Sequence, residues 1–229
     1  MAESTSIYFY NIKEGSDFAP AGSVEADAFK KAIAILSKQP GYIRSFWGPR
    51  VQSPNKVVGT IDWRDVADNK KFIESDAYKS VTLLFDKVFD MQGKPPFVSQ
   101  DTVNFKWDSV TARKTKITEF ASFDIAASSS SEDKAKLESQ LEKSLDFVRE
   151  NNGRAPSIGW SIDRVQVPQG LTHPLQLFLG WDSLDDCAKI GKHPDFFGVL
   201  SPLRAMVLDP TEDMAMFYAR LRADSDFLN

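Results

Sequence analysis

The chain of 229 residues contains an internal repeat. One copy runs from Trp63 as WRDVADNKKFIESDAYKSV, and the other runs from Trp181 as WDSLDDCAKIGKHPDFFGV. Tryptophan, acidic, aromatic and valine positions coincide at an offset of 118 residues (181 − 63) without a gap. Because both copies must build the same supersecondary unit, this repeat restricts the fold more than any other feature. We therefore predict two domains, residues 1–110 and 111–229, each near the commonest domain size.

Each copy shows the same order of elements, βαββαβ. Runs of β-branched and aromatic residues predict strands at 7–12, 42–51, 56–63 and 97–107, and again at 116–125, 157–167, 175–181 and 214–221. Helices are predicted where a polar cap precedes apolar residues at i, i+3, i+4 and i+7. Their predicted starts are Ser23, Asp65, a break near Ser75, a capping box formed by Ser129 and Glu132, Ser183, and a break at His193-Pro194.

The predicted sheets carry apolar side chains on both faces. Alternate residues of a strand point to opposite faces, so Leu177, Leu179 and Trp181 share one face, and Phe178 lies on the other. Helices of a βαββαβ unit cover one face of the sheet and leave the other bare. The second copy can supply the missing cover. The sequence therefore predicts an α+β fold in which the two copies pair within one chain.

Composition argues against several classes of protein. The formal net charge of −4 offers no basic surface for nucleic acid. The apolar runs are far shorter than the roughly 20 residues that span a bilayer, and the first residues lack the pattern of a secretory signal. A single cysteine, Cys187, excludes an internal disulfide and suggests a reducing compartment. We therefore expect a cytoplasmic protein without nucleic-acid or membrane partners.

The residues that bind metals and cofactors are sparse. Two separated histidines, His173 and His193, and one cysteine give no zinc or iron-ligand pattern. No glycine-rich nucleotide-binding motif and no Gly-x-Ser-x-Gly motif is present. We expect any catalysis to proceed without a metal or a cofactor, and we expect Cys187 to be a small buried apolar residue.

Several short motifs give the chain a family resemblance. They are Pro40-Gly41-Tyr42, Phe46-Trp47-Gly48, Ile61-Asp62-Trp63-Arg64, Phe72-x-x-Ser75-x-x-Tyr78, Gly180-Trp181-Asp182-Ser183 and Lys192-His193-Pro194-Asp195-Phe196. With these motifs the chain resembles the dimeric α/β-barrel superfamily, and within it the antibiotic-biosynthesis-monooxygenase-like proteins. The resemblance implies two ferredoxin-like modules that form a pseudo-dimeric α/β barrel, a form associated with fungal secondary metabolism. A further homodimer is possible but is not needed to close the barrel.

The resemblance also implies a class of function. The superfamily includes cofactor-independent monooxygenases of phenolic polyketides, polyketide cyclases, lactone isomerases, decarboxylating enzymes and members without an established activity. It implies a cofactor-independent tailoring enzyme that cyclises, isomerises or oxygenates a hydrophobic polyketide-like intermediate in an aromatic-lined pocket. A non-catalytic small-molecule-binding or stress-associated protein is the alternative. Related plant cyclases carry His-Pro-x-His, and here Phe196 stands in place of the later histidine.

Three residues are candidates for catalysis: His193, Tyr78 and Asp182. A histidine titrates near neutral pH and can shuttle protons, but His193 also stands where a helix N-cap or a surface residue is expected. Six residues are candidates for substrate binding: Trp47, Trp63, Trp160, Trp181, Phe196 and Arg44. Aromatic side chains suit flat polyketide rings, and the alternative for each tryptophan is to fill the core. For charged strand residues such as Arg44 and Asp182, the alternative to a role in the site is a position in solvent or at the interface between the two copies.

The pocket is expected in the second copy. Gly59 and Gly180 are expected to leave room beside the strands, and Trp160 is expected to take the part of Trp47. The loop at 168–174 is five residues longer than its counterpart and is expected to act as a lid. His173 is expected to be a solvated residue of that loop.

Overall fold

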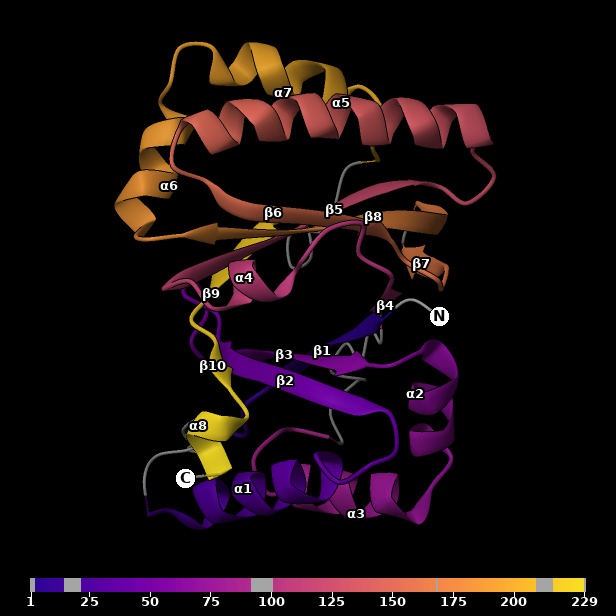
Figure 1. The fold of residues 1–229 in the computed structure, drawn as a ribbon, viewed down its shortest axis with the longest axis vertical. Helices are drawn as coiled ribbons and strands as arrows, with labels where there is room; N and C mark the ends of the chain where they lie inside the picture. Colours follow the sequence, from indigo (N-terminus) through magenta and orange to yellow (C-terminus); the bar gives the residue numbers. More distant parts are fainter. Residues whose placement is uncertain (1–2, 15–21, 92–100, 168, 209–215, 229) are drawn as a thin grey trace. The chain divides into compact units, whose positions relative to one another are not determined.

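The computed structural model describes residues 3–14, 22–91, 101–167, 169–208 and 216–228. The chain divides into two compact units (Figure 1). The first unit consists of Met1–Asn104 together with Ala219–Asn229, and the second is Phe105–Tyr218. The domain boundary at residue 110 stays a prediction; these units place the C-terminal eleven residues with the first copy of the repeat.

The first unit is an antiparallel sheet with helices on one face. Its sheet has the order β10-β2-β3-β1-β4, formed by β1 (Ser4–Asn11), β2 (Tyr42–Pro49), β3 (Lys56–Trp63), β4 (Asp101–Val103) and β10 (Arg222–Ala223). Its helices are α1 (Val24–Leu36), α2 (Val66–Ile73), α3 (Asp76–Phe85) and α8 (Ser225–Leu228). Helices α1 and α3 lie side by side along the sheet (Figure 1). The predicted strand at 97–107 begins outside the described residues, and β4 is its described part.

The helices of the first unit begin where the sequence predicts. The Ser23 hydroxyl accepts a hydrogen bond from the Ala26 amide at 2.9 Å and starts α1. The apolar stripe of α1 is buried, as predicted: Phe29, Ala32, Ile33 and Leu36. Asp65 and Ser75 cap α2 and α3 in the same way. The predicted break in the second helical region is therefore confirmed.

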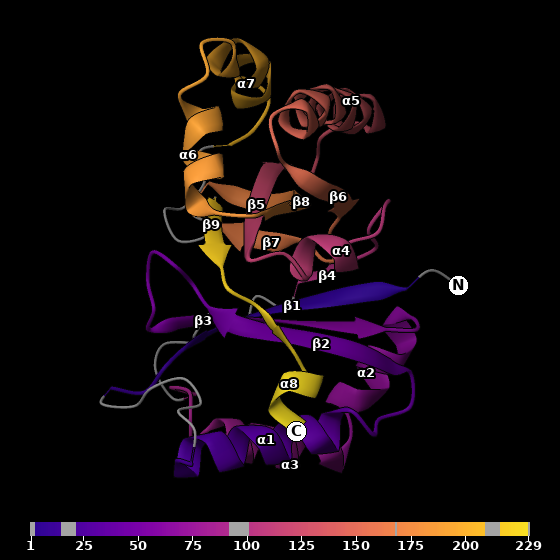
Figure 2. The same cartoon turned by 60° about the vertical axis from the view of Figure 1, so that its left-hand side comes forward.

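The second unit repeats this plan. Its strands are β5 (Ile117–Ala126), β6 (Arg154–Trp160), β7 (Val165–Val167), β8 (Gly170–Trp181) and β9 (Met216–Ala219), in the order β6-β8-β5-β9 with β7 beside β8. Its helices are α4 (Val110–Arg113), α5 (Ser131–Glu150), α6 (Leu184–Gly191) and α7 (Phe196–Arg204). Helices α5, α6 and α7 lie on one side of the sheet (Figure 2).

Strand register confirms the repeat. Trp63 pairs with Ser4 at the start of β1, and Trp181 pairs in the same way with Ile117 at the start of β5. Helices α2 and α6 also keep the predicted offset, since 184 − 66 and 191 − 73 both equal 118. The fold class is α+β, with two ferredoxin-like units in one chain. Closure of the two sheets into one barrel stays a prediction.

Three local predictions were wrong. The capping box of α5 is formed by Ser130 and Asp133, one residue later than predicted, because Ser130 holds the extended N-cap geometry. Helix α7 begins after Asp195, so His193 is not its N-cap. Residues 170–174 do not form the predicted lid loop, because Gly170 already begins β8 and the strand runs through them.

His173 therefore lies in a strand and not in a solvated loop. It pairs with Ile125 across β5 and β8 and is 8% exposed. Its Nε2 lies 2.7 Å from the Ser161 carbonyl oxygen, and its ring contacts Trp160. Burial lowers the pKa of His173, which favours the neutral ring. The short β7–β8 hairpin extends β8 because Thr172 and Gly170 pair with Val165 and Val167.

Candidate pocket in the second unit

The second unit contains a pocket of about 740 Å³ between its sheet and its helices. Volumes of about 300–1,000 Å³ are typical of small-molecule sites. Leucines of β8 form the floor, and apolar residues of α5, α6 and α7 form the roof. Representative lining residues are Leu141, Leu145, Leu177, Leu179, Ile190 and Leu200. The pocket is thus built from residues of β5, β8 and β9 on the sheet side and of α5, α6 and α7 on the helix side.

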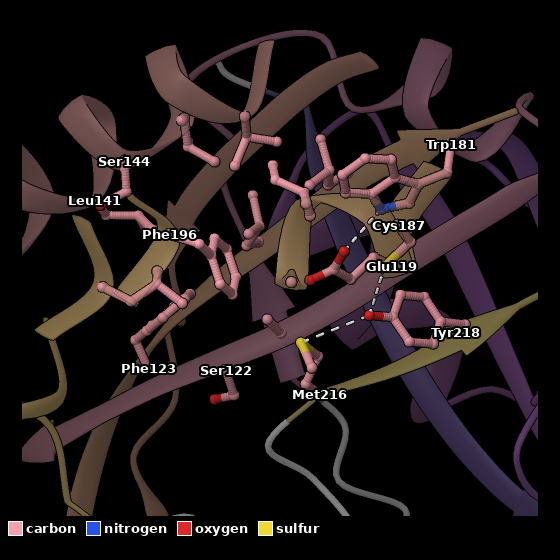
Figure 3. Close-up of a pocket in the computed structure, with 18 of the residues that line it drawn as sticks. Glu119, Ser122, Phe123, Leu141, Ser144, Trp181, Cys187, Phe196, Met216 and Tyr218 are labelled. Atoms are coloured by element: carbon pink, nitrogen blue, oxygen red, sulfur yellow. Dashed lines mark hydrogen bonds between the residues drawn. The ribbon is translucent and has the colours of Figure 1, made fainter. Parts of the chain in front are cut away.

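One acidic side chain, Glu119 of β5, stands in this apolar wall. Glu119 alternates with Ala121 and Phe123 on the pocket face, and it is 8% exposed. Trp181 of β8 donates a hydrogen bond from Nε1 to Glu119 Oε2 at 2.7 Å (Figure 3). Burial raises the pKa of Glu119 from 4.5 to about 7, and the Trp181 hydrogen bond opposes that rise. Glu119 is therefore divided between acid and base forms near neutral pH.

A sulfur–hydroxyl cluster lies at the same end of the pocket. Cys187 of α6 donates from Sγ to the hydroxyl oxygen of Tyr218 in β9 at 2.8 Å (Figure 3). Burial raises the pKa of Cys187 to about 11. Burial, the neighbouring Glu119 charge and Cys187 raise the pKa of Tyr218 above its usual range. Both groups are therefore protonated at neutral pH.

The corresponding space in the first unit is filled. Tyr8 pairs with Gly59, and Ala121 pairs with Leu177, so Tyr8 and Ala121 occupy equivalent positions (177 − 118 = 59). Tyr8 is buried, and its ring stacks near Tyr10. Where the second unit has Ala121 and open space, the first unit has a tyrosine ring.

Trp47 fills the rest of that space in the first unit. A Cβ atom added to Gly59 would lie 2.2 Å from the Trp47 ring, so the room predicted at Gly59 is occupied. Trp47 pairs with Gly59, and in the second unit Ile158 pairs with Leu177. Ile158 is thus the counterpart of Trp47, and the prediction that Trp160 plays this part was wrong. A smaller side chain at this position leaves the second unit hollow.

Comparison with known proteins shows which solved structures have a similar fold. No family model and no curated protein sequence matches the chain. An anthrone oxidase-like protein superposes with a TM-score of 0.65 at 13% identity, covering 98% of this chain and 94% of that chain. A candidate chlorite dismutase superposes with a TM-score of 0.58 at 12% identity, covering 100% of this chain and 98% of that chain. A candidate monooxygenase from Fusobacterium nucleatum superposes with a TM-score of 0.56 at 10% identity, covering 97% of this chain and 92% of that chain.

The chain shares the fold of these proteins. The likeness spans both units and bears out, at the level of the fold, the resemblance to antibiotic-biosynthesis-monooxygenase-like proteins. At these identities it establishes the fold alone, so the chemistry must be argued from the side chains of the pocket.

Two of the predicted substrate-binding residues, Trp181 and Phe196, line the pocket. The other tryptophans lie elsewhere. Trp47 and Trp63 are buried in the core of the first unit. Trp160 donates from Nε1 to Glu138 of α5 at 3.1 Å, outside the pocket lining. The room predicted at Gly180 is also filled, because an added Cβ atom would lie 2.5 Å from Thr115.

His193, Asp182, Tyr78 and Arg44 also lie outside the pocket lining. The His193 side chain is 36% exposed, contacts Phe147, and its Nδ1 accepts from the Asp195 amide at 3.3 Å. Asp182 forms an ion pair with Arg154. In the first unit, Tyr78 contacts Phe72, and Arg44 lies 3.3 Å from Asp62. Their predicted roles in catalysis and binding stay predictions.

Sequence reasoning missed Glu119, Tyr218 and Cys187 as pocket residues. The signal for Glu119 is parity: it shares a strand face with Ala121 and Phe123 inside an otherwise apolar strand. A glutamate on the buried face of a strand is rare unless it is paired. Among the described residues, no three histidine, cysteine, aspartate or glutamate side chains gather into a metal site.

Proposed function

We propose that the chain is a cofactor-independent enzyme that oxygenates a hydrophobic, enolisable ring compound of the polyketide class in the pocket of the second unit. The observation that carries this proposal is the Glu119 carboxyl, buried in an apolar pocket with a pKa of about 7. A general base works best when its pKa lies near the working pH. Raised carboxyl pKa values in apolar pockets are a common mark of catalytic sites.

Glu119 removes a proton from a carbon atom next to a carbonyl group of the bound ring compound. The C–H electron pair moves into the ring system and onto the carbonyl oxygen, forming an enolate or phenolate. The apolar walls formed by Leu177, Leu179 and Phe196 hold the flat ring and exclude water. The Trp181 indole N–H keeps the Glu119 carboxyl oriented toward the ligand.

Dioxygen then accepts electrons from this anion, and a new C–O bond forms. For anthrone as substrate, the methylene carbon becomes a carbonyl: anthrone and O₂ give anthraquinone and water. One oxygen atom enters the product, and the other leaves in water with the two methylene hydrogens. The substrate supplies all the electrons, so the balance requires only O₂ as co-reactant.

Oxygenation is favoured over the other reactions of the class by the likeness to an anthrone oxidase-like protein and to a candidate monooxygenase, although that likeness concerns the fold. Cyclisation and isomerisation begin with the same proton removal. They differ in the fate of the anion, which attacks a second carbonyl group or takes the proton back at another carbon atom.

The test uses anthrone at pH 7, with oxygen uptake and anthraquinone absorbance measured against a protein-free blank. We expect one O₂ consumed per anthrone, and we expect Glu119→Gln to lower the rate about 10²- to 10⁴-fold. Glu138→Gln is a matched control, because Glu138 also accepts from a tryptophan Nε1 but lies outside the pocket. An unchanged rate in Glu119→Gln removes Glu119 as the base.

The remaining outcomes identify the alternatives. A rearranged product from a polyketide-like ketone without oxygen uptake would indicate a cyclase or an isomerase. Saturable binding of anthrone without any reaction would indicate a small-molecule-binding protein.

A further inference from the structure

Tyr218 presents its hydroxyl group to the same part of the pocket as the Glu119 carboxyl (Figure 3). Strand alternation in β9 fixes this direction. Tyr218 and Met216 line the pocket, while Phe217 between them is buried and stacks on Phe120 with centroids 4.8 Å apart. The side chain of Tyr218 is thus held by a strand of the sheet and not by a loop. The Glu119 charge contributes to the raised pKa of Tyr218.

Cys187 sets the role of the Tyr218 hydroxyl. The thiol donates to the Tyr218 oxygen at 2.8 Å, so this oxygen acts as an acceptor. The hydroxyl proton of Tyr218 points toward Met216 Sδ at 4.0 Å, and a thioether is a weak acceptor. A carbonyl oxygen of a ligand is a stronger acceptor and competes for this proton. A hydroxyl that accepts one hydrogen bond also becomes a better donor in the next.

We propose that Tyr218 is a second catalytic residue, which donates a hydrogen bond to the substrate oxygen that gains negative charge as Glu119 removes the proton, with Cys187 as a positioning residue. This inference rests on the proposed function. In this step the C–H bond breaks, its proton goes to Glu119, and its electron pair moves to the carbonyl oxygen. Tyr218 keeps its own proton throughout, because burial holds its pKa above its usual range.

The arrangement also restricts the substrate. The Glu119 carboxylate and the Tyr218 hydroxyl lie at one end of the pocket, and the other end is mainly apolar, with Phe123, Leu141 and Phe196 beside the hydroxyl groups of Ser122 and Ser144 (Figure 3). A ligand that carries a carboxylate at its reacting end would meet the Glu119 charge. The reacting end is therefore a neutral ketone or phenol attached to an apolar ring system.

The first experiment measures proton removal without oxygen. Anthrone is incubated anaerobically in D₂O, and deuterium exchange at its methylene carbon is followed by mass spectrometry. Loss of one donor to a developing oxyanion costs about 10²- to 10³-fold. We therefore expect Tyr218→Phe to lower exchange about 100-fold, with the Kd of anthrone changed less than threefold. We expect Cys187→Ala to lower exchange several-fold and Cys187→Ser, which restores a donor, to recover it. Tyr42→Phe is the matched control, since this tyrosine lies in the first unit.

The second experiment needs no turnover. 2-Naphthol, whose absorbance reports its ionisation, is bound to Glu119→Gln, in which residue 119 is neutral. We expect bound naphthol to ionise at a pH at least one unit lower in Glu119→Gln than in the double variant Glu119→Gln/Tyr218→Phe, because burial raises its pKa equally in both and only the first retains the Tyr218 donor. A purely structural Tyr218 would leave the two ionisation pH values equal.

The outcomes separate the two proposals. If exchange is unchanged in Tyr218→Phe, or if naphthol fails to bind or ionises independently of Tyr218, the role of Tyr218 is refuted. If naphthol ionisation depends on Tyr218 but wild-type protein exchanges no deuterium into anthrone, the Tyr218 contact stands and the proposed function fails.

Discussion

At the scale of single residues, the chemistry of the pocket depends on the burial of Glu119, whose carboxylate loses its hydration and gains one hydrogen bond from Trp181. Burial is the largest influence on its pKa, and the hydrogen bond from Trp181 opposes it. The equivalent position in the first unit is Ser6, which pairs with Ile61 as Glu119 pairs with Leu179 (179 − 118 = 61). A neutral hydroxyl there avoids the cost of a buried charge, so the two copies share a backbone but differ in acid–base chemistry.

Glu119 should make stability depend on pH. Its folded pKa of about 7 lies above the unfolded value of 4.5, so the folded state binds the proton more tightly. The stabilising contribution is complete below about pH 4.5 and is lost as the pH rises to about 7. A difference of about 2.5 units corresponds to about 3 kcal/mol. We expect urea unfolding to show this loss between pH 4.5 and 7 in wild type but not in Glu119→Gln; equal slopes would contradict it.

Removing the indole donor should shift the pH dependence of the reaction. Trp181→Phe deletes the N–H group that favours the charged carboxylate, and a hydrogen bond to a charged group is worth about 1.5–3 kcal/mol. We expect the pKa seen in kcat/KM for anthrone oxidation to rise by about one to two units. Trp63→Phe is the control, because Trp63 is the equivalent tryptophan of the first unit and Glu119 belongs to the second. An unshifted profile would mean that Glu119 is not the titrating base.

His193→Ala tests the residue that the sequence favoured for catalysis. Because His193 lies outside the pocket lining and its ring makes a T-shaped contact with Phe147 of α5, we expect turnover within about twofold of wild type. Its Nδ1 accepts one hydrogen bond from the Asp195 amide just before α7, so stability should fall by at most about 1 kcal/mol. Melting and turnover are measured on the same variant. A loss of turnover of 10²-fold or more would restore the predicted proton transfer.

At the scale of elements, strand register decides which copy is hollow. β2 and β6 each contain an irregularity near their start, at Tyr42/Arg44 and at Arg154/Ser157. After it, Trp47 faces Gly59 in one copy, and Ile158 faces Leu177 in the other. A shift in register by one residue would turn these side chains to the opposite face. The size of the pocket therefore depends on strand pairing as well as on composition.

This dependence explains what the sequence could predict. Helix starts could be predicted from local patterns, which are the caps at Ser23, Asp65 and Ser75. The main hairpins could be predicted because the offset of 118 repeats the same order of elements. Trp160 was misassigned because its partner across the sheet, Leu175, cannot be read from the order of residues. Tyr218 could be placed in the pocket only from the fold, since β9 begins 90 residues after β5 ends (216 − 126). Pairings of this kind are set by tertiary contacts and not by local pattern.

Exchanging side chains between equivalent strand positions tests the filled and the hollow copy. We expect Ala121→Tyr to place a ring in the pocket, as Tyr8 does in the first unit, and to weaken anthrone binding at least tenfold with little change in melting temperature. The reciprocal Tyr8→Ala should cost about 3 kcal/mol, because it opens a cavity in a filled core. Both are measured by urea unfolding and by anthrone titration. A large loss of stability in Ala121→Tyr would show that the pocket has no room for the ring.

At the scale of the whole molecule, the first unit is discontinuous. Its last strand and helix, β10 and α8, come from the C-terminal residues (Figure 2). β10 pairs with β2, and Phe227 of α8 contacts Phe29 of α1. Tyr42 also donates a hydrogen bond to Asp224. The second unit is one continuous segment, 105–218. No helix among the described residues is long and apolar enough to cross a membrane.

Deleting residues 220–229 should loosen the first unit selectively. The deletion removes β10 and α8 but leaves β9 complete. We expect faster amide hydrogen exchange in β2 and α1 and unchanged protection in β5 and β8. Phe227→Ala is the milder control: it removes the ring contacts with Phe29 and Arg222 and keeps the backbone of β10, so α1 should lose more protection than β2. Uniform loss of protection throughout the chain would show that the C-terminal segment supports both units.

The discontinuity of the first unit has a consequence during protein synthesis. Pro49 ends β2, and Arg222, which begins the strand that pairs with it, is made 173 residues later (222 − 49). At about 5–20 residues per second, the ribosome needs roughly 10–35 seconds to add them. Throughout that interval β2 presents an unpaired edge, which is a template for association with other chains. Synthesis of the second unit ends at Tyr218, whereas the first unit also needs residues 219–229. The first unit therefore begins to be synthesised first but is completed last.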